Sequence, residues 1–251
     1  MSKAGIAVYD DAFFDAQVEG SLRSARVIVP IVVKLLRPRS VIDIGCGRGA
    51  WLRAFEENGV EQVWGVDGHY VNRSKLLVHP TKFLQIDLRR PFRIEERYDL
   101  ALCLEVAEHL TSKTGRNLVR TLTGLAPIIL FSAAIPGQGG NCHINEQWPS
   151  YWMSLFAEYA FLRLDPIRQH IWNDPRVEWW YRQNIFLYAS RQAIAESPRL
   201  QAEERAAQAL ECVHPLILDR WTTVRGLLGE IPRAVHRAIQ LRLQPRSRTE
   251  C

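Results

Sequence analysis

The sequence predicts a doubly wound α/β fold around a mostly parallel, seven-stranded sheet. Short apolar runs recur along the chain and alternate with segments of helical or loop character, as in a parallel sheet covered on both faces. A glycine-rich turn, residues 45–49, follows the first of these runs directly. The composition, 47% hydrophobic and 24% charged over 251 residues, is that of a globular chain large enough to bury a substantial core.

An entry helix and seven strands are expected in order along the chain. Residues 20–36 are rich in apolar side chains and lead into Arg37-Pro38, which stops a helix. Seven apolar runs then read as strands, because turn residues or helical segments separate them. These runs are Val41–Ile44, Gln62–Val66, Phe83–Ile86, Leu100–Leu104, Ile128–Ala133, Phe161–Leu164 and Ile185–Ala189. Beyond Ser190 the chain favours helix, and we expect a helical, arginine-rich C-terminal extension over residues 196–251.

The composition also indicates a cellular compartment. The most apolar stretches are too short to span a bilayer, and a proline interrupts each of them. Residues 1–20 carry four acids and no long apolar core, so we expect no signal peptide. Five cysteines, an odd number without paired spacing, fit reduced thiols better than a disulfide framework. We therefore expect a cytoplasmic protein.

The net charge of +5 is unevenly distributed. Residues 220–251 hold seven arginines and two glutamates, so this tail alone accounts for the excess. The rest of the chain balances at 25 basic against 25 acidic residues, which leaves no excess charge for a phosphate backbone. We expect no DNA partner, and RNA or a membrane surface could be met only through the tail. The oligomeric state is left open.

The glycine-rich turn predicts a site for an adenosine-bearing cofactor. Gly45, Gly47 and Gly49 have no side chain to keep a ligand away from the backbone, and the first turn of the following helix offers unpaired N–H groups. The same glycines, with Ala50, also satisfy the dinucleotide fingerprint, so they leave two cofactors open. Asp43, two residues before the first glycine, would repel a pyrophosphate and attract a sulfonium or an ammonium group. The acid therefore favours a methyl donor.

At this turn the chain resembles the class I S-adenosylmethionine-dependent methyltransferases, of the small-molecule type. Their first motif is an acid two residues ahead of Gly-x-Gly-x-Gly, and residues 43–49 match it without a gap. The resemblance implies a Rossmann-like sheet whose last two strands form an antiparallel hairpin, with S-adenosyl-L-methionine as the cofactor. The resemblance covers roughly residues 20–190. With the change of composition after Ser190, we expect a methyltransferase domain over residues 1–195, in which Tyr9, Phe13 and Phe14 of the N-terminal segment are candidates for a lid over the cofactor or for a hydrophobic anchor.

The resemblance further implies which residues bind the cofactor. Asp67, at the end of the second strand, is expected to accept the ribose hydroxyls, although an acid there also fits a helix N-cap or a solvated turn. Asp87 and Leu88 are expected at the adenine amino group and ring. The full set of expected cofactor-binding residues is Asp43, Gly45, Cys46, Gly47, Gly49, Asp67, Gly68, Asp87, Leu88, Leu104 and Glu105.

The fourth strand and the residues after it favour a small-molecule acceptor. The ending Glu105-Val-x-Glu108-His109-Leu110 resembles small-molecule methyltransferases, and the Asn/Asp-Pro-Pro-Tyr loop of nucleic-acid amino methyltransferases is missing from the sequence. We expect O-methylation of a glycan or a natural-product intermediate. Three alternatives stay open: an RNA methyltransferase that uses the basic tail, a nicotinamide-dependent oxidoreductase, and a non-catalytic cofactor-binding partner.

Candidate catalytic residues lie in a polar loop, residues 136–148, after the fifth strand. His143 is the candidate general base for an acceptor hydroxyl, and Glu146 is an orienting or substrate-binding acid. Both could instead cap backbone groups. His109, beyond the fourth strand, competes for the role of base. The Cys142-His143 pair lacks the ligand number and spacing of a zinc site, so we expect no metal.

Aromatic residues are concentrated late in the chain. Residues 148–188 contain twelve of the 24 aromatic side chains. They either wall an acceptor pocket suited to a sugar or a planar ring, or fill the core between the late strands and their helix. Arg182, beside this cluster, is a candidate for holding a carboxylate or phosphate of the substrate.

Overall fold

The computed structural model describes residues 11–206 and 213–217, with the side chains of the first helix described from Val18 onward. The chain divides into two compact units, residues 1–211 and 212–251. In the second unit the described residues form a short helical turn at 215–217. Within the described ranges, no helix combines the length and the apolar character needed to cross a membrane.

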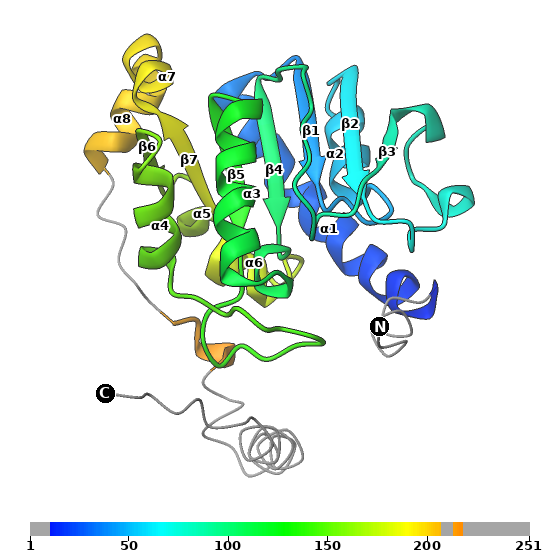
Figure 1. Ribbon diagram of the computed structural model, residues 1–251. Helices are drawn as coiled ribbons and strands as arrows, with labels where there is room; N and C mark the ends of the chain where they lie inside the picture. The colour runs from blue at the N-terminus through cyan, green and yellow to red at the C-terminus, as the bar shows by residue number, and fades with distance from the viewer. Residues whose placement is uncertain (1–10, 207–212, 218–251) are drawn as a thin grey trace, which may run out of the picture. The chain divides into compact units, whose positions relative to one another are not determined.

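A seven-stranded sheet forms the centre of the first unit (Figure 1). Its strands are β1 (Ser40–Ile44), β2 (Gln62–Asp67), β3 (Phe83–Gln85), β4 (Leu100–Leu104), β5 (Ile128–Ser132), β6 (Phe161–Leu164) and β7 (Phe186–Ser190). They lie in the order β3-β2-β1-β4-β5-β7-β6. The first five strands pair in parallel, and β7 is antiparallel to both β5 and β6. The predicted mostly parallel sheet with a late antiparallel pair is confirmed.

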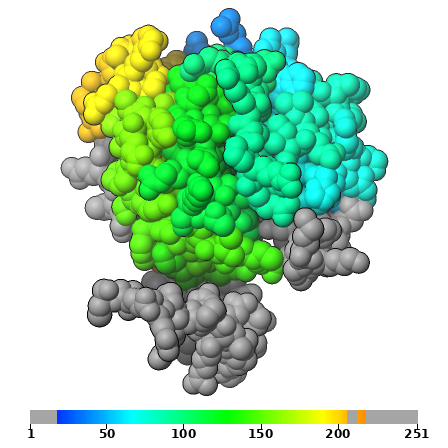
Figure 2. All heavy atoms as spheres, in the orientation of Figure 1, coloured from blue at the N-terminus to red at the C-terminus, as the bar shows by residue number. Residues whose placement is uncertain are grey.

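Helices cover both faces of this sheet. They are α1 (Asp11–Leu36), α2 (Ala50–Glu57), α3 (Ser112–Leu125), α4 (Pro149–Ala157), α5 (Arg168–Ile171), α6 (Trp179–Asn184), α7 (Arg191–Glu196) and α8 (Pro198–Ala206), with 3-10 turns η2 (Arg73–Lys75), η3 (Pro80–Lys82) and η4 (Ala107–His109). In the orientation of Figure 1, the atoms of α3 and α4 cover the near face (Figure 2).

The alternation of side chains along the strands explains the two layers. In β4, Leu100 and Leu102 pack with the buried side chains of α1 and α2, whereas Ala101 and Cys103 pack with those of α3 and α4. Every residue of β4 is buried. A strand with both faces covered therefore reads as a continuous apolar run.

The entry helix begins earlier than the sequence indicated. α1 starts at Asp11 rather than at residue 20 and ends, as predicted, at Leu36. Ala25, Ile28, Val29 and Val32 are fully or almost fully buried, at the i, i+3, i+4, i+7 spacing of one helix face. Pro30 lies on the exposed face of the helix, away from these contacts.

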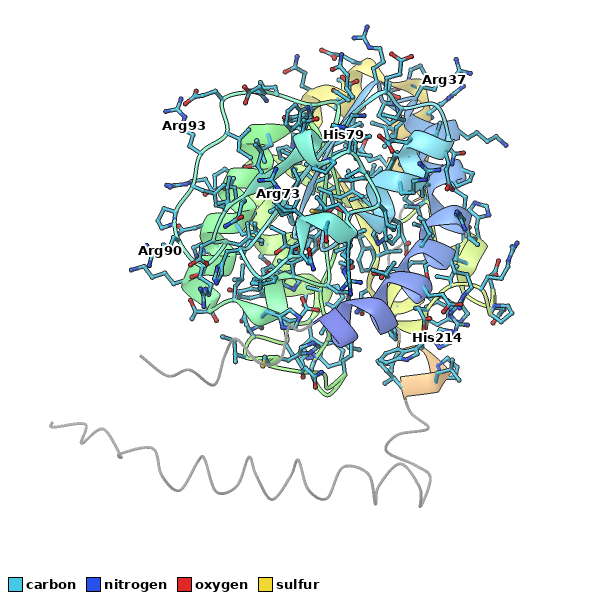
Figure 3. The ribbon with its side chains drawn as sticks, turned by 90° about the vertical axis from the view of Figure 1, so that its right-hand side faces the viewer. Arg37, Arg73, His79, Arg90, Arg93 and His214 are labelled. Carbon is cyan, nitrogen blue, oxygen red and sulfur yellow. The ribbon has the colours of Figure 1, made fainter. Side chains whose placement is uncertain are left out.

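The connections on the β3 side of the sheet carry many basic residues (Figure 3). Arg73 and His79 come from the turns after β2, and Arg90 and Arg93 from the irregular segment between β3 and β4. The side chains of Arg90 and Arg93 are more than four-fifths exposed. These residues lie on the surface and do not belong to the core.

The end of the described first unit packs on the entry helix. The guanidinium of Arg199 in α8 donates a hydrogen bond to the carbonyl of Lys34 at 2.7 Å, and Leu200 is buried. Residues 220–251, most of the predicted arginine-rich extension, lie outside the described residues. So do Tyr9 and the side chains of Phe13 and Phe14, the predicted lid.

Candidate active site

The glycine turn begins where β1 ends, and its first position accepts only glycine. Gly45 has φ +87°, and a Cβ atom there would lie 2.3 Å from Cγ2 of Val106. Its N–H donates to the carbonyl of Val66 at 2.7 Å, which ties the turn to β2. The close approach of Val106 and the left-handed backbone both exclude a side chain.

The remaining turn residues lead into α2 with positive φ angles. Gly47 has φ +53°, and its N–H donates to Oδ2 of Asp67 at 2.7 Å. Gly49 has φ +82° and is the N-cap residue of α2. The backbone therefore reaches the first turn of α2 without Cβ atoms in the way, close to N–H groups that have no partner within the helix.

A pocket opens where the carboxyl ends of β1, β2 and β4 meet. The chain reverses its direction across the sheet between β1 and β4, which is where ligands bind in open α/β sheets. Every predicted cofactor residue except Gly49 lines this pocket. The lining includes Asp43, Gly45, Cys46, Gly47, Asp67, Gly68, Asp87, Leu88, Leu104 and Glu105.

Two buried carboxyl groups lie side by side at the turn. Burial raises the pKa of Asp43 to about 7, and the negative charge of Asp67 adds to this shift. Burial also raises the pKa of Asp67, although hydrogen bonds from Tyr70, Gly68 and Gly47 oppose the shift. A cation or a set of hydroxyl donors in the pocket would stabilise the ionised forms of both.

The carboxylate of Asp67 already accepts several hydrogen bonds. Oδ1 accepts from the N–H of Gly68 at 2.7 Å and from the hydroxyl of Tyr70, and Oδ2 accepts from Gly47. A carboxylate has about four acceptor sites. Two ribose hydroxyls can therefore bind Asp67 only if Tyr70 releases it.

The two residues predicted to contact adenine, Leu88 and Asp87, differ in whether their side chains already bind another residue. Leu88 is 8% exposed and presents an apolar side chain to the pocket. Asp87 also lines the pocket, but its two oxygens accept from the guanidinium of Arg89 at 2.8 and 3.0 Å. The hydrogen bond from Arg89 is the main cause of a lowered pKa at Asp87.

Several pocket residues were not singled out from the sequence as cofactor contacts. Arg48, within the glycine turn itself, is 4% exposed and lines the pocket. Trp51 in α2 and Tyr181 in α6 pack edge to face with ring centroids 5.1 Å apart, and both line the pocket as well. Only the position of Arg48 within the motif could have been noticed, because Tyr181 reaches the pocket through tertiary packing.

The loop after β5 carries a histidine held by a carboxylate. Nδ1 of His143 lies 3.0 Å from Oε1 of Glu146. The two oxygens of Glu146 also accept from the backbone N–H groups of Gly137 at 2.8 Å and Gly139 at 2.9 Å. Burial alone would raise the pKa of Glu146, but these hydrogen bonds, led by that of His143, lower it. Glu146 therefore both closes the loop and orients the imidazole.

The second predicted histidine lies beside the first. His109 ends η4, lines the pocket, and its ring centroid is 4.8 Å from that of His143. Burial, and then the proximity of His143, lower the pKa of His109 to about 4. The structure therefore brings the three predicted catalytic residues together, with His109 a neutral imidazole at neutral pH.

The polar network at the end of β4 includes residues from three elements. Glu105 has φ +55°, a left-handed conformation that non-glycine residues seldom adopt. Its carboxylate accepts from the side-chain amides of Gln138 at 2.9 Å and Asn184 at 3.1 Å. The network links the strand end to the loop after β5 and to the end of α6.

The aromatic excess belongs mostly to the core. Trp152, Phe156 and Tyr188 are at most 2% exposed, and Phe156 stacks on Tyr188 with centroids 4.0 Å apart. Within this cluster only Tyr181 lines the pocket. Arg182 is 9% exposed and donates to the carbonyl of Trp172 at 3.3 Å, so it serves the packing of this region.

Comparison with known proteins agrees with this geometry. A family model described as a methyltransferase domain matches residues 16–179, more than half of the chain. The chain is 31% identical over 138 residues to a ubiquinone biosynthesis O-methyltransferase of Nitrobacter winogradskyi and 32% identical over 141 residues to one of Rhodopseudomonas palustris. Each match covers 53% of this chain and 49% and 50% of the respective relative, so the chain spans about half the length of these relatives.

Two solved structures share the fold at low sequence identity. The methyltransferase domain of a bacterial Hen1 protein has a TM-score of 0.50 at 18% identity, over 67% of this chain and 97% of that domain. An O-methyltransferase family protein from Burkholderia thailandensis has a TM-score of 0.51 at 14% identity, over 71% of this chain and 59% of that protein.

Proposed function

The chain belongs to the class I S-adenosylmethionine-dependent methyltransferases, and we propose that it transfers the methyl group of this cofactor to an oxygen atom of a small-molecule acceptor. The observation that carries the proposal is a single pocket lined by the glycine turn, by Asp67 and by His109. Such a pocket can hold the cofactor with its reactive end beside the histidines.

The residues at the turn fit this cofactor. Gly45 has no side chain, so Val106 can pack directly against the backbone of the turn, and both residues line the pocket. Asp67 provides carboxylate oxygens for ribose hydroxyls, and Leu88 provides an apolar surface for a ring. Asp43, with its pKa raised to about 7, gains stability as an anion when a positive group lies beside it.

The chemistry requires alignment more than activation of the donor. When bound, S-adenosylmethionine supplies a methyl group on a positively charged sulfur, which already drives the displacement. The protein must hold the acceptor oxygen in line with that methyl group and promote loss of the hydroxyl proton. His109 and His143, two imidazoles beside the pocket, are the groups placed to act on the hydroxyl.

The acceptor is proposed to combine a hydroxyl group with an apolar or ring-shaped body. The relatives quoted above are named O-methyltransferases, which supports oxygen as the nucleophile. Ile144 and Trp148, on the loop that carries His143, are 64% and 43% exposed. Large apolar side chains on this loop offer an aromatic or aliphatic contact to an acceptor. A natural-product intermediate or a glycan meets these requirements.

We propose that residues 1–195 carry out the methyl transfer and that this domain has no DNA partner. The exposed arginines labelled on the β3 side come from two connections, Arg73 from the turns after β2, and Arg90 and Arg93 from the segment between β3 and β4 (Figure 3). The buried free thiols of Cys46 and Cys103 fit the proposed cytoplasmic location.

Calorimetric titration tests cofactor choice directly. We expect the full chain to bind S-adenosylmethionine in preference to NAD. Asp67→Ala should lose that binding, because the ribose hydroxyls lose their acceptor. Glu158→Gln is the matched control, since Glu158 is a half-exposed acid paired with Arg116 far from the pocket. Tighter binding of NAD, or unchanged affinity in Asp67→Ala, would contradict the assignment.

A methyl-transfer screen tests the acceptor class. Phenols, glycans and short RNAs are each incubated with the full chain and radiolabelled cofactor. We expect labelled product from hydroxyl-bearing small molecules, and loss of turnover with retained cofactor affinity in His143→Ala. Labelling of RNA alone would favour a nucleic-acid methyltransferase, and cofactor binding without any product would favour a non-catalytic partner.

A further inference from the structure

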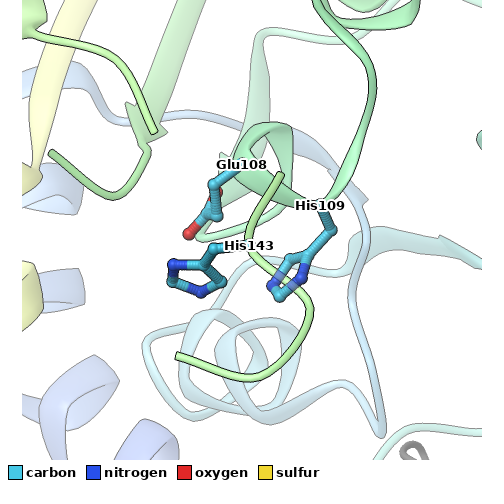
Figure 4. A group of neighbouring side chains, drawn as sticks. All are labelled: Glu108, His109 and His143. Carbon is cyan, nitrogen blue, oxygen red and sulfur yellow. The ribbon is translucent and has the colours of Figure 1, made fainter. Parts of the chain in front are cut away.

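Three side chains with metal-binding atoms converge beside the pocket (Figure 4). Glu108 and His109 come from η4, directly after β4, and His143 comes from the loop after β5. One ligand atom from each lies within 4.8 Å of the others. Backbone hydrogen bonds fix this arrangement, because the N–H groups of Ile144 and Asn145 donate to the carbonyl of Glu108 at 2.9 and 3.0 Å.

Glu108 is a buried acid beside a second acid. Its side chain is 0% exposed, and the groups that face it are the backbone N–H groups of Glu108 and Ala134 and the carboxyl group of Glu105. The carboxyl group of Glu105 adds negative charge at this place. In the part of the chain that the structure describes, no lysine or arginine forms an ion pair with either acid. A buried carboxylate of this kind is expected to carry a proton or to bind a cation.

Both histidines are oriented through one ring nitrogen. Nδ1 of His143 lies 3.0 Å from Glu146, whose carboxylate is held by the loop backbone. His109 forms a hydrogen bond to the backbone of Cys142. Metal-binding histidines usually donate one N–H to a carboxylate or a carbonyl, which fixes the tautomer and leaves the other nitrogen for the ion. Both imidazoles have that partner here.

The backbone around the cluster is held in unfavourable conformations. Glu105, three residues before Glu108, has φ +55°, and Cys142, directly before His143, has φ +58°. Left-handed non-glycine residues cost about 1 kcal/mol or more and persist where the surrounding structure requires them, often at functional sites. Both positions lie within three residues of a candidate ligand.

We propose that Glu108, His109 and His143 bind a divalent first-row transition-metal ion, with Zn²⁺ as the best fit. Two imidazoles and one carboxylate are the ligand set of catalytic zinc sites, which keep a further position open. Imidazole nitrogen disfavours Mg²⁺ and Ca²⁺, which prefer oxygen ligands. The proposal departs from the expectation of no metal, which considered only the adjacent Cys142 and His143.

The geometry requires a small closure on binding. Ligands around a tetrahedral ion with bonds of about 2.1 Å lie about 3.4 Å apart. The largest separation of 4.8 Å therefore has to shorten by roughly 1.4 Å, a distance that side-chain rotation covers. The fold thus brings the three ligands near one another, and binding of the ion would draw them to bonding distance.

An ion at this place also has a chemical use, which rests on the proposed function. A hydroxyl oxygen of the acceptor would occupy the open position, and the ion would lower its pKa so that the proton leaves to solvent. The oxygen lone pair then forms the bond to the methyl carbon, while the electrons of the sulfur–methyl bond return to sulfur. In this role His143 is a ligand of the ion rather than the proton acceptor.

Direct titration tests the site without any acceptor. Full-length protein is treated with a chelator, and ZnCl₂ is titrated in by calorimetry, with MgCl₂ for comparison. We expect one Zn²⁺ per chain and weaker binding of Mg²⁺. Glu108→Gln and His143→Ala should each weaken Zn²⁺ by more than about 100-fold, beyond the 10–100-fold typical of losing an outer partner. His170→Ala, which removes an exposed histidine of α5, should bind like the parent.

The outcomes separate the site from the proposed function. Cofactor affinity measured on the same variants establishes that they are folded. Absence of stoichiometric Zn²⁺ binding, or equal affinity in all variants, would overturn the site, and so would tighter binding of Mg²⁺. A failed acceptor screen leaves the titration valid. Methyl transfer at an unchanged rate after complete removal of the ion would overturn its part in activating the acceptor.

Discussion

At the scale of single residues, polar groups that line the pocket already form hydrogen bonds with one another. Asp67 illustrates this, because the hydroxyl of Tyr70 and the backbone N–H groups of Gly47 and Gly68 take up most of its acceptor capacity. The position of Asp67 at a strand end was predictable from the sequence. Its competition with Tyr70 was not predictable, because it depends on how the Tyr70 side chain packs. The Tyr70 ring lies so close to Gly68 that a Cβ atom at position 68 would be 2.3 Å from it.

Removing the Tyr70 hydroxyl should strengthen cofactor binding. In Tyr70→Phe, Asp67 no longer has to give up a hydrogen bond worth about 1 kcal/mol net, so the dissociation constant should fall roughly fivefold. The same loss should slightly lower the melting temperature of the cofactor-free protein. Calorimetry and thermal unfolding measure the two effects.

The control for this prediction is another tyrosine without such a partner. The hydroxyl of Tyr159 forms no hydrogen bond to any residue in the described ranges, so Tyr159→Phe should change neither quantity. Weaker cofactor binding in Tyr70→Phe would show instead that the hydroxyl helps to hold the ligand.

At the scale of elements, the strands were predictable and the site loops were not. The seven strands follow from local apolar runs, and observed boundaries such as β3 at Phe83–Gln85 or β7 at Phe186–Ser190 differ from expectation by about one residue. The meeting of Glu108 with His143 depends on the loop after β5 hydrogen-bonding to η4. A contact between two loops has no periodicity, so the sequence did not reveal it.

The glycine turn offers a test of how tightly an element is specified. Gly45→Ala would place Cβ 2.3 Å from Val106 at φ +87°, so both strain and overlap oppose it. We expect a loss of about 2–4 kcal/mol in the free energy of unfolding, together with loss of cofactor affinity. Denaturant unfolding and calorimetry measure the two quantities.

Gly124 in α3 is the matched control for this substitution. A Cβ atom there meets nothing within 4 Å and the residue is exposed, so Gly124→Ala should stabilise the helix by about 0.5–1 kcal/mol. Equal effects at Gly45 and Gly124 would mean that the turn relaxes easily, and the argument for a shaped cofactor cradle would be lost.

At the scale of the whole molecule, the strand order creates the site. Because the chain turns back between β1 and β4, residues that follow these two strands line one pocket, and the loop after β5 hydrogen-bonds to η4 beside it. The family resemblance drawn from residues 43–49 implied this topology, and the fold confirms it. The boundary at residue 195 was set by composition alone, and it stays a prediction.

Two truncations test where the methyltransferase domain ends. All residues that line the pocket precede Asn184, and the first compact unit runs to residue 211. A chain ending at residue 211 should therefore bind the cofactor like the full protein.

A chain ending at residue 195 loses α8, in which Leu200 is 1% exposed and Arg199 hydrogen-bonds to α1. Losing the buried leucine should cost about 1.5–3 kcal/mol of unfolding free energy. Equal stability of the two truncations would place the boundary at residue 195, whereas loss of cofactor affinity in the longer one would show that residues 212–251 contribute to binding.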